Sequence, residues 1–256
     1  MAYPFPHQEQ HKVYPNTFLE NTSVSLIACH WDGVFSSDFE KLYPKFVDSF
    51  FHLPKSVEDF KKQKEMSVSA PEDGLTYSFK PDKAYIRRDR KSYISFLSSI
   101  MTEILPLKVF LFDVMKFSSI ENLQVRKLNI LPIEAESDDE IRNKLMDVYR
   151  FLYSDDFLKY VQDATLPIDA PWILNFRKAV FSEGDNEVTL RIGIAKANNK
   201  EHIYNVVLDS SARCSKPSII EEGSVDRKLL KLNDCLYDAF HWCVKEDIIQ
   251  LMEEEK

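Results

Sequence analysis

The longest apolar stripe in the sequence lies near its C-terminal end, and it constrains the fold more than any other feature. No Pro or Gly interrupts the segment from Val225 to Met252. Apolar residues recur there at spacings of three and four: Leu229, Leu232, Leu236, Phe240, Cys243, Val244, Ile248, Leu251 and Met252. This spacing predicts one amphipathic helix with Ser224 as its N-cap, about 40 Å long at 1.5 Å per residue. Such a helix must pack its stripe against a sheet or another helix.

The first half of the sequence has the pattern of a strand, a capped helix, a hairpin and a second helix. The predicted elements are a strand at 24–31, a helix that begins after Ser37, a hairpin at 75–79 and 84–88, and a helix at 93–117. Pro44 and Pro106 should kink or split the two helices, because proline cannot donate the helical hydrogen bond. The charged residues 55–74 are interpreted as a surface connection.

The second half repeats this order. The predicted elements are a strand at 121–133, a helix that begins after Ser137, a helical restart near 154–161, a three-stranded meander at 172–181, 188–195 and 203–208, and the final helix. Ser137 and Glu140 have the spacing of a capping box. Residues 209–223 are interpreted as a polar loop.

These patterns predict an α+β fold. Strands grouped as hairpins, with helices between the groups, favour two related units of antiparallel sheet with helices on one face. The long C-terminal helix would cover the second sheet. The predicted division is an extended arm at 1–17, a first unit at 18–118 and a second unit at 119–256, with one continuous domain as the alternative.

Composition excludes several classes of protein. The chain has 256 residues, a net charge of −8 and only five Gly, which disfavours Gly-rich phosphate loops and general nucleic-acid binding. The four Cys form no CxxC pair, so we expect reduced thiols in a cytoplasmic protein, with no metal and no cofactor. Neither a signal peptide nor a membrane-spanning apolar run is recognisable.

Two sets of residues could support catalysis. Cys29, His30 and Asp32 supply a thiol, an imidazole and a carboxylate, but neighbouring residues on a strand point to opposite faces. Asp234, Asp238 and His241 lie on one stripe of the final helix, at a spacing that can hold a metal ion. A solvated helix face explains the same spacing and is the preferred interpretation.

Basic residues suggest two further binding sites. Arg87, Arg88 and Arg90 lie close to aromatic residues, a combination that can bind single-stranded nucleic acid, although a solvated hairpin edge is the preferred interpretation. Arg126 and Lys127 are adjacent on a predicted strand, so one of them must face inward. A buried cation there would need an acidic partner, or it would line a site.

Several short motifs occur in a characteristic order along the whole chain. They are Tyr77 and Phe79 in a Tyr-x-Phe strand, Lys91-Ser92-Tyr93, Arg126 and Asn129 in an Arg-x-x-Asn strand, and Asn233-Asp234 with Phe240 six residues later. In this order the chain resembles a family of uncharacterised, sporadically distributed bacterial proteins of about 250 residues that end in a long helix. The resemblance implies no catalytic residues. The patchy distribution of the family is typical of genes that travel with phage-defence and toxin–antitoxin systems. This link is an association between genes and not a physical argument about this chain.

The sequence therefore predicts a non-enzymatic protein that acts by binding a protein partner or another copy of itself, within a bacterial phage-defence or toxin–antitoxin type of system. The first alternative is a hydrolase or metal-dependent enzyme that uses His30 and Asp32, or Asp238 and His241. The second alternative is a nucleic-acid-binding accessory protein that uses Arg87, Arg88 and Arg90.

Overall fold

The computed structural model describes residues 2–9, 12, 14, 18–28, 39–50, 56–60, 65–70, 72–80, 83–89, 100–164, 173–197, 200–214 and 219–253. The chain divides into two compact units, each assembled from separate stretches of sequence. Unit 1 comprises Met1–Glu20, Lys127–Ala212 and Asp234–Lys256, and unit 2 comprises Asn21–Arg126 and Arg213–Asn233.

The predicted α+β class with a large antiparallel sheet is confirmed. The strands of unit 2 are β2 (Ser56–Phe60), β3 (Glu65–Ala70), β4 (Leu75–Phe79), β5 (Ala84–Asp89), β1 (Leu19–Ala28) and β6 (Ile120–Glu134), hydrogen-bonded in that order. The strands of unit 1 are β6, β10 (Ile203–Cys214), β9 (Asn186–Lys196), β8 (Ile173–Glu183) and β7 (Gln162–Asp163), again in that order. A few strands and one helix contribute residues to both units.

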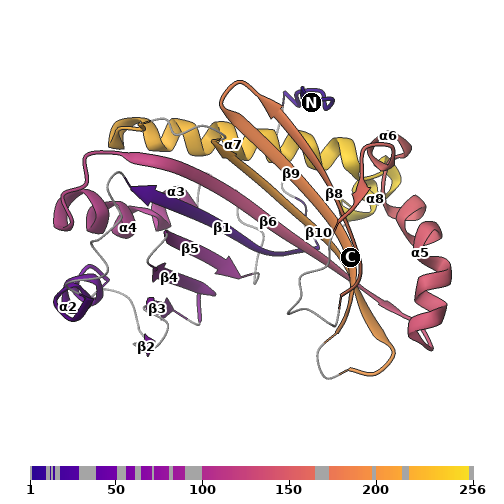
Figure 1. Cartoon of the computed structure of the whole chain (residues 1–256), viewed down its shortest axis with the longest axis horizontal. Helices are drawn as coiled ribbons and strands as arrows, with labels where there is room; N and C mark the ends of the chain where they lie inside the picture. The colour runs from indigo at the N-terminus through magenta and orange to yellow at the C-terminus, as the bar shows by residue number, and fades with distance from the viewer. Residues whose placement is uncertain are drawn as a thin grey trace. The chain divides into compact units, whose positions relative to one another are not determined.

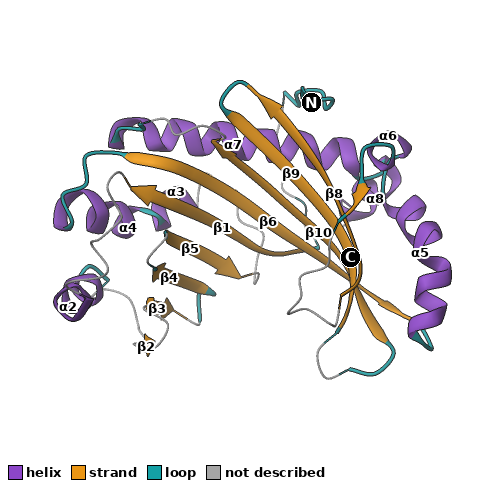
Figure 2. Cartoon of the chain, viewed as in Figure 1, coloured by secondary structure: helices purple, strands orange, loops and turns teal. Residues whose placement is uncertain are grey.

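The hairpin of unit 2 forms where it was predicted. β4 pairs with β5 in antiparallel register, with Tyr77 opposite Ile86 and Phe79 opposite Ala84, and these four side chains are buried. The two strands lie side by side (Figure 2). Alternating burial of apolar side chains therefore determines the register of this hairpin.

The interpretation of residues 55–74 as a surface connection is wrong, because this stretch contains β2 and β3. Met66, Val68 and Ala70 alternate on β3 and are buried. The polar residues between them are also partnered, since the hydroxyl groups of Ser67 and Ser78 lie 3.2 Å apart across the β3–β4 pair. Charged and serine residues hid the period of two from the sequence pattern.

Helices of unit 2 pack aromatic side chains against this sheet. Helix α2 (Phe39–Asp48) runs through Pro44 without a break, so the predicted split does not occur. Phe46 lies 5.1 Å from Phe110 and 6.3 Å from Phe79, measured between ring centroids. The predicted helix at 93–117 is observed as α3 (Ile100–Glu103), α4 (Leu105–Val109) and the π-helical segment η1 (Phe110–Val114). Its break falls at Ile104, close to the predicted kink at Pro106, and residues 93–99 lie outside the described residues.

The meander of unit 1 is confirmed. β8, β9 and β10 are long strands that run side by side (Figure 1). Val188, Leu190, Ile192 and Ile194 alternate along β9 and are buried. Gly184 takes a φ of +57° in the turn between β8 and β9, a conformation that glycine adopts without steric cost. The polar loop predicted from residue 209 is wrong at its start, because β10 continues to Cys214 with Ala212 and Cys214 buried.

The capping box predicted at Ser137 and Glu140 is confirmed. Helix α5 (Asp138–Leu152) begins after Ser137, whose Oγ accepts a hydrogen bond from the Glu140 N–H at 3.2 Å. The Glu140 side chain in turn accepts one from the Glu136 N–H at 2.7 Å. Ser154 caps the short helix α6 (Asp155–Leu158) in the same way, as the predicted restart requires.

The single final helix predicted from Val225 to Met252 is wrong, because it is two helices. α7 (Glu222–Cys243) ends before Val244, and α8 (Glu246–Glu253) follows. In unit 1 the Ser154 N–H donates to the Cys243 carbonyl at 2.8 Å, and the Lys245 N–H donates to the Leu152 carbonyl at 3.0 Å. Leu152 at the end of α5 and Ser154 beyond it therefore bind backbone groups that would otherwise continue the helix. Ser224, the predicted N-cap, lies inside α7.

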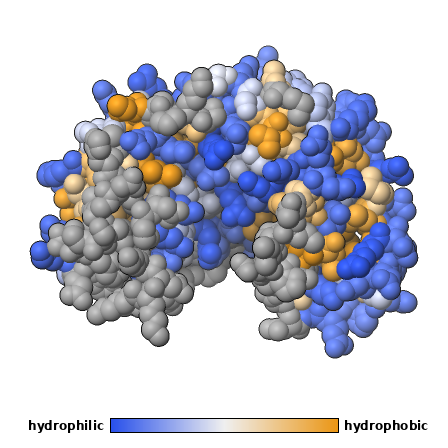
Figure 3. Space-filling model, in the orientation of Figure 1, coloured by the Kyte–Doolittle hydropathy of each residue, from blue (hydrophilic) through white to orange (hydrophobic). Residues whose placement is uncertain are grey.

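The apolar stripe of α7 and α8 is largely buried, as predicted, with Leu251 as an exception. Leu229, Leu232, Leu236 and Cys243 are at most 1% exposed, whereas Leu251 is 54% exposed. On the face in view in Figure 3, hydrophilic side chains predominate among the described residues, with separate apolar areas between them. Among the described helices, none combines the length and the apolar character needed to cross a bilayer.

Candidate functional site

Two of the basic residues predicted to bind nucleic acid, Arg87 and Arg88, are described in unit 2, and acids pair with both. Arg87 Nε lies 2.9 Å from the Asp89 carboxylate on β5, and Arg88 forms an ion pair with Glu103 of α3. Arg90 lies outside the described residues. The ion pairs use part of the positive charge that phosphate binding would need.

The strand β6 turns Lys127 inward and Arg126 outward. Arg126 is exposed and is the last residue of its unit 2 segment. Lys127 is the first residue of the next unit 1 segment, and it lies on the same face of the strand as Asn129, which is buried two residues later. Burial lowers the pKa of Lys127 to about 8, and the nearby Asp234 carboxylate opposes that shift. The inward-facing cation of the pair is therefore Lys127, and its acidic neighbour is Asp234.

The interpretation of Asp234, Asp238 and His241 as a solvated face is wrong for Asp238, which is only 7% exposed. The Asp238 carboxylate lies 3.0 Å from His7 Nδ1 and accepts the Gln8 N–H at 2.9 Å. The hydrogen bond that His7 donates to Asp238 raises the pKa of His7, so protonation of His7 strengthens this contact and rising pH weakens it. The predicted extended arm thus lies against α7.

His241 is held by the same arm. Its Nε2 atom lies 2.5 Å from the Tyr14 hydroxyl, and Tyr14 is buried. Burial lowers the pKa of His241 below its ordinary value, so at neutral pH the ring is uncharged and can accept a hydrogen bond from the Tyr14 hydroxyl. His30 and Asp32, the other predicted catalytic pair, lie outside the described residues.

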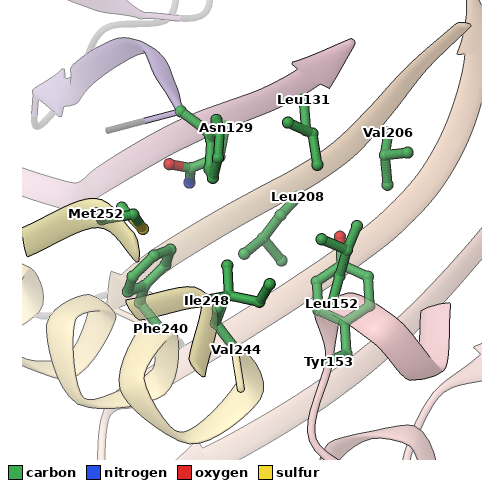
Figure 4. Close-up of a pocket in the computed structure, with 11 residues that line it drawn as sticks. Asn129, Leu131, Leu152, Tyr153, Val206, Leu208, Phe240, Val244, Ile248 and Met252 are labelled. Atoms are coloured by element: carbon green, nitrogen blue, oxygen red, sulfur yellow. The ribbon is translucent and has the colours of Figure 1, made fainter. Parts of the chain in front are cut away.

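A separate feature of unit 1 is an apolar cavity, which sequence reasoning did not predict. Its lining residues come from the chain before β1, from β6 and β10, from the end of α5 and from the α7–α8 segment (Figure 4). They are Phe18, Asn129, Leu131, Leu152, Tyr153, Val206, Leu208, Phe240, Val244, Ile248 and Met252. In Figure 4 the strand residues Leu131, Val206 and Leu208 face Phe240, Val244 and Ile248 across the space.

The helix break builds one side of this cavity. Val244 forms an isolated bridge with Tyr153, which holds the end of α5 beside the end of α7. α8 then brings Ile248 and Met252 to the space, and both are at most 6% exposed. An uninterrupted helix would carry these two residues farther along the α7 axis.

Polar atoms in the cavity are few. Asn129 supplies an amide and is 9% exposed. Tyr153 supplies a phenol, and burial raises its pKa well above the ordinary value of 10, so its hydroxyl stays protonated and can donate a hydrogen bond. No charged side chain occurs among the described lining residues. The cavity volume is about 40 Å³.

Other chemistry is sparse in the described parts of the chain. There, no group of three or more His, Cys, Asp or Glu side chains is arranged to hold a metal ion. Cys214, Cys235 and Cys243 carry free thiols, as predicted, and Cys29 lies outside the described residues. Burial raises the pKa of the Cys243 thiol, which keeps it protonated and unreactive.

Comparisons with known proteins do not identify a family. No family model matches the sequence, and no curated protein matches it. Among solved structures, the chain is weakly similar to the crystal structure of the di-domain ARO/CYC BexL from the BE-7585A biosynthetic pathway. The TM-score is 0.16 and the sequence identity 9%, over 79% of this chain and 80% of that one. A likeness at this level carries no argument about function.

Proposed function

We propose that unit 1 is a binding module for a small, neutral and mainly apolar molecule, held in the cavity between the strands β6 and β10 and the helical segment that includes α8. The supporting observation is the lining, in which apolar side chains from five parts of unit 1 converge on one space. Apolar walls with a few placed polar groups are typical of small-molecule sites.

The polar atoms indicate the class of ligand. Asn129 can donate and accept a hydrogen bond, and the neutral Tyr153 hydroxyl can donate one. A charged ligand would lose its hydration without gaining an opposite charge from the lining residues described. An alcohol, ketone or ester with an alkyl chain fits these requirements.

The volume limits what enters without rearrangement. About 40 Å³ is well below the roughly 150 Å³ of a cavity that accepts benzene. A few heavy atoms therefore fill the space, such as a short alkyl chain or the end of a longer one.

A series of straight-chain alcohols tests the proposal. Saturation-transfer NMR should detect binding, and affinity should rise about fourfold with each added methylene until the cavity is full. Ile248→Phe should abolish the signal by filling the space. The matched control is Leu251→Phe on the same helix, because Leu251 is exposed and does not line the cavity. Absence of binding at every chain length, or equal binding by the Ile248 variant, contradicts the proposal.

The predicted protein-binding function is a second candidate, supported by the edge of the sheet in unit 1. β8 spans Ile173–Glu183, but β7 pairs only with Arg177 and Lys178. Among the described residues no strand pairs with the outer edge of β8 from Ala179 to Glu183. An open edge of this kind can accept an extended strand from a partner.

Size-exclusion chromatography and pulldowns from the native operon test this second candidate. Val180→Lys should reduce capture of the partner, because a lysine on an edge strand deters strand addition. Val180→Thr is the control that keeps β propensity without the charge. An unpartnered monomer in both assays rules out partner binding. The setting in a bacterial phage-defence or toxin–antitoxin system rests on the family resemblance alone.

The enzymatic and nucleic-acid alternatives remain predictions. Asp238 already accepts two contacts from the arm, and Arg87 and Arg88 are paired with acids, which makes these residues less suited to either role. The origin of the fold by duplication of one unit also remains a proposal, supported by the similar order of elements in the two halves of the sequence.

A further inference from the structure

The described residues of the N-terminal arm, 2–9, 12 and 14, lie on a surface of unit 1 that is separate from the apolar cavity. This arm-binding surface is formed by Phe181 of β8 and by four residues near the end of α7, namely Tyr237, Asp238, His241 and Trp242. None of these five residues lines the cavity. The arm-binding surface is therefore distinct from the cavity: the arm occupies it, and it combines aromatic with polar side chains.

Phe5 is the apolar anchor of the arm. It is only 8% exposed, and its ring lies 6.0 Å from both Phe181 and Trp242, measured between centroids. Tyr3 stacks on it at 4.7 Å. Trp242 also contacts Phe157 and Tyr160, so the anchor reaches a larger aromatic cluster.

Polar contacts then orient the rest of the arm. Two positions after Phe5, His7 contacts the Asp238 carboxylate at 3.0 Å. Farther along, the Lys12 N–H donates to the Tyr237 hydroxyl at 2.8 Å, and the Lys12 ammonium pairs with Glu253 at 2.7 Å. His7 and Lys12 of the arm thus meet acidic side chains of α7 and α8.

Helix side chains, and not a neighbouring strand, accept the backbone hydrogen bonds of the arm. The N–H groups of Gln8 and Lys12 both donate to side-chain oxygens, and no strand is assigned within the described part of the arm. A segment held in this way is recognised as a peptide would be, by one anchor pocket and a few hydrogen bonds. Recognition of this kind depends on local sequence and does not require the peptide to belong to the same chain.

We propose that the arm-binding surface is a peptide-binding site which the arm occupies in cis, and that it accepts an extended segment of a partner protein with an aromatic residue followed two positions later by a histidine. The arm is then an internal competitor that such a partner must displace. This proposal gives the protein-binding candidate, on which it rests, a defined surface. Neither the cavity nor the β8 edge enters its test, so it can fail while they stand.

A labelled synthetic peptide of residues 2–14 provides the test, measured by fluorescence anisotropy against full-length protein. Phe5→Ala in the protein weakens its own arm, so this variant should bind the wild-type peptide at least about tenfold more tightly than the unaltered protein does. Asp238→Asn added to that variant should reduce the binding again. Glu9→Gln in the protein is the control, because Glu9 is an exposed arm residue.

The peptide itself carries the second comparison. A peptide with Phe5→Ala should bind the weakened-arm protein at least about tenfold less tightly than the wild-type peptide. Circular dichroism verifies that each variant is folded, and His7→Ala replaces Phe5→Ala in the protein if the latter unfolds. Equal affinity for the two peptides, or no gain of binding when the arm is weakened, overturns the proposal.

Discussion

Filling the apolar cavity with one added methylene should stabilise the protein. Val206 lies on β10, lines the cavity and is 2% exposed. Unfilled space of about 40 Å³ costs about 1 kcal/mol at roughly 24 cal/mol per Å³. Burying one more methylene contributes about 0.8 kcal/mol, so Val206→Ile should raise the free energy of unfolding by about 0.5–1 kcal/mol.

Urea unfolding followed by circular dichroism measures this change. The midpoint should rise with an unchanged slope, because the substitution alters stability and not the surface exposed on unfolding. Leu208→Ala is the opposite perturbation, since it enlarges the same space and should cost about 2–5 kcal/mol. A loss of 1 kcal/mol or more in Val206→Ile would refute the reasoning, because it would mean that the site is already close-packed.

The same variant links stability to binding. If the cavity is the ligand site, Val206→Ile should be the more stable protein and the weaker binder of short alcohols. Leu208→Ala should be destabilised and should recover part of its stability when an alcohol fills the larger space, by mass action. The opposite result is an unfolding midpoint of Leu208→Ala that does not respond to alcohols that bind the unaltered protein. That result would contradict the assignment of the cavity as the ligand site.

Three further predictions concern other parts of the fold. Leu236→Asp places a charge at a position that is 1% exposed and should abolish soluble expression or the cooperative thermal transition; retained helicity and solubility would show that the stripe is not core. Ser137→Ala removes the cap of α5 and should lower the free energy of unfolding by about 0.5–2 kcal/mol, measured in urea, whereas the exposed Arg150→Ala should change it little. Burial holds the pKa of Lys127 at about 8, below its unfolded value, so the penalty on folding is full below pH 8 and is relieved as pH rises toward the unfolded value. Lys127→Met should therefore stabilise the protein at pH 7 and flatten the rise in stability above pH 8, and an unchanged pH profile would contradict the burial of the amine.

The sequence by itself determined the elements whose signals are local. Ser137 and Glu140 predicted the start of α5 because a capping box depends on atoms four residues apart at most. The alternation along β9 and the hairpin of β4 and β5 were predictable for the same reason, since each strand shows its buried face in its own period. The reduced state of the described cysteines, Cys214, Cys235 and Cys243, followed from cysteine spacing.

Tertiary contacts decided what local patterns could not. The apolar stripe predicted one uninterrupted helix, but α7 ends at Cys243, where Ser154 and Leu152 take the hydrogen bonds of Cys243 and Lys245. That break is what brings Ile248 and Met252 to the cavity. Asp238 looked solvated because nothing near it in the sequence buries it, and its partner His7 is 231 residues away. Periodicity predicts which side chains of an element will be buried, but their contacts depend on residues distant in the chain. The candidate sites of this protein are formed by such long-range contacts.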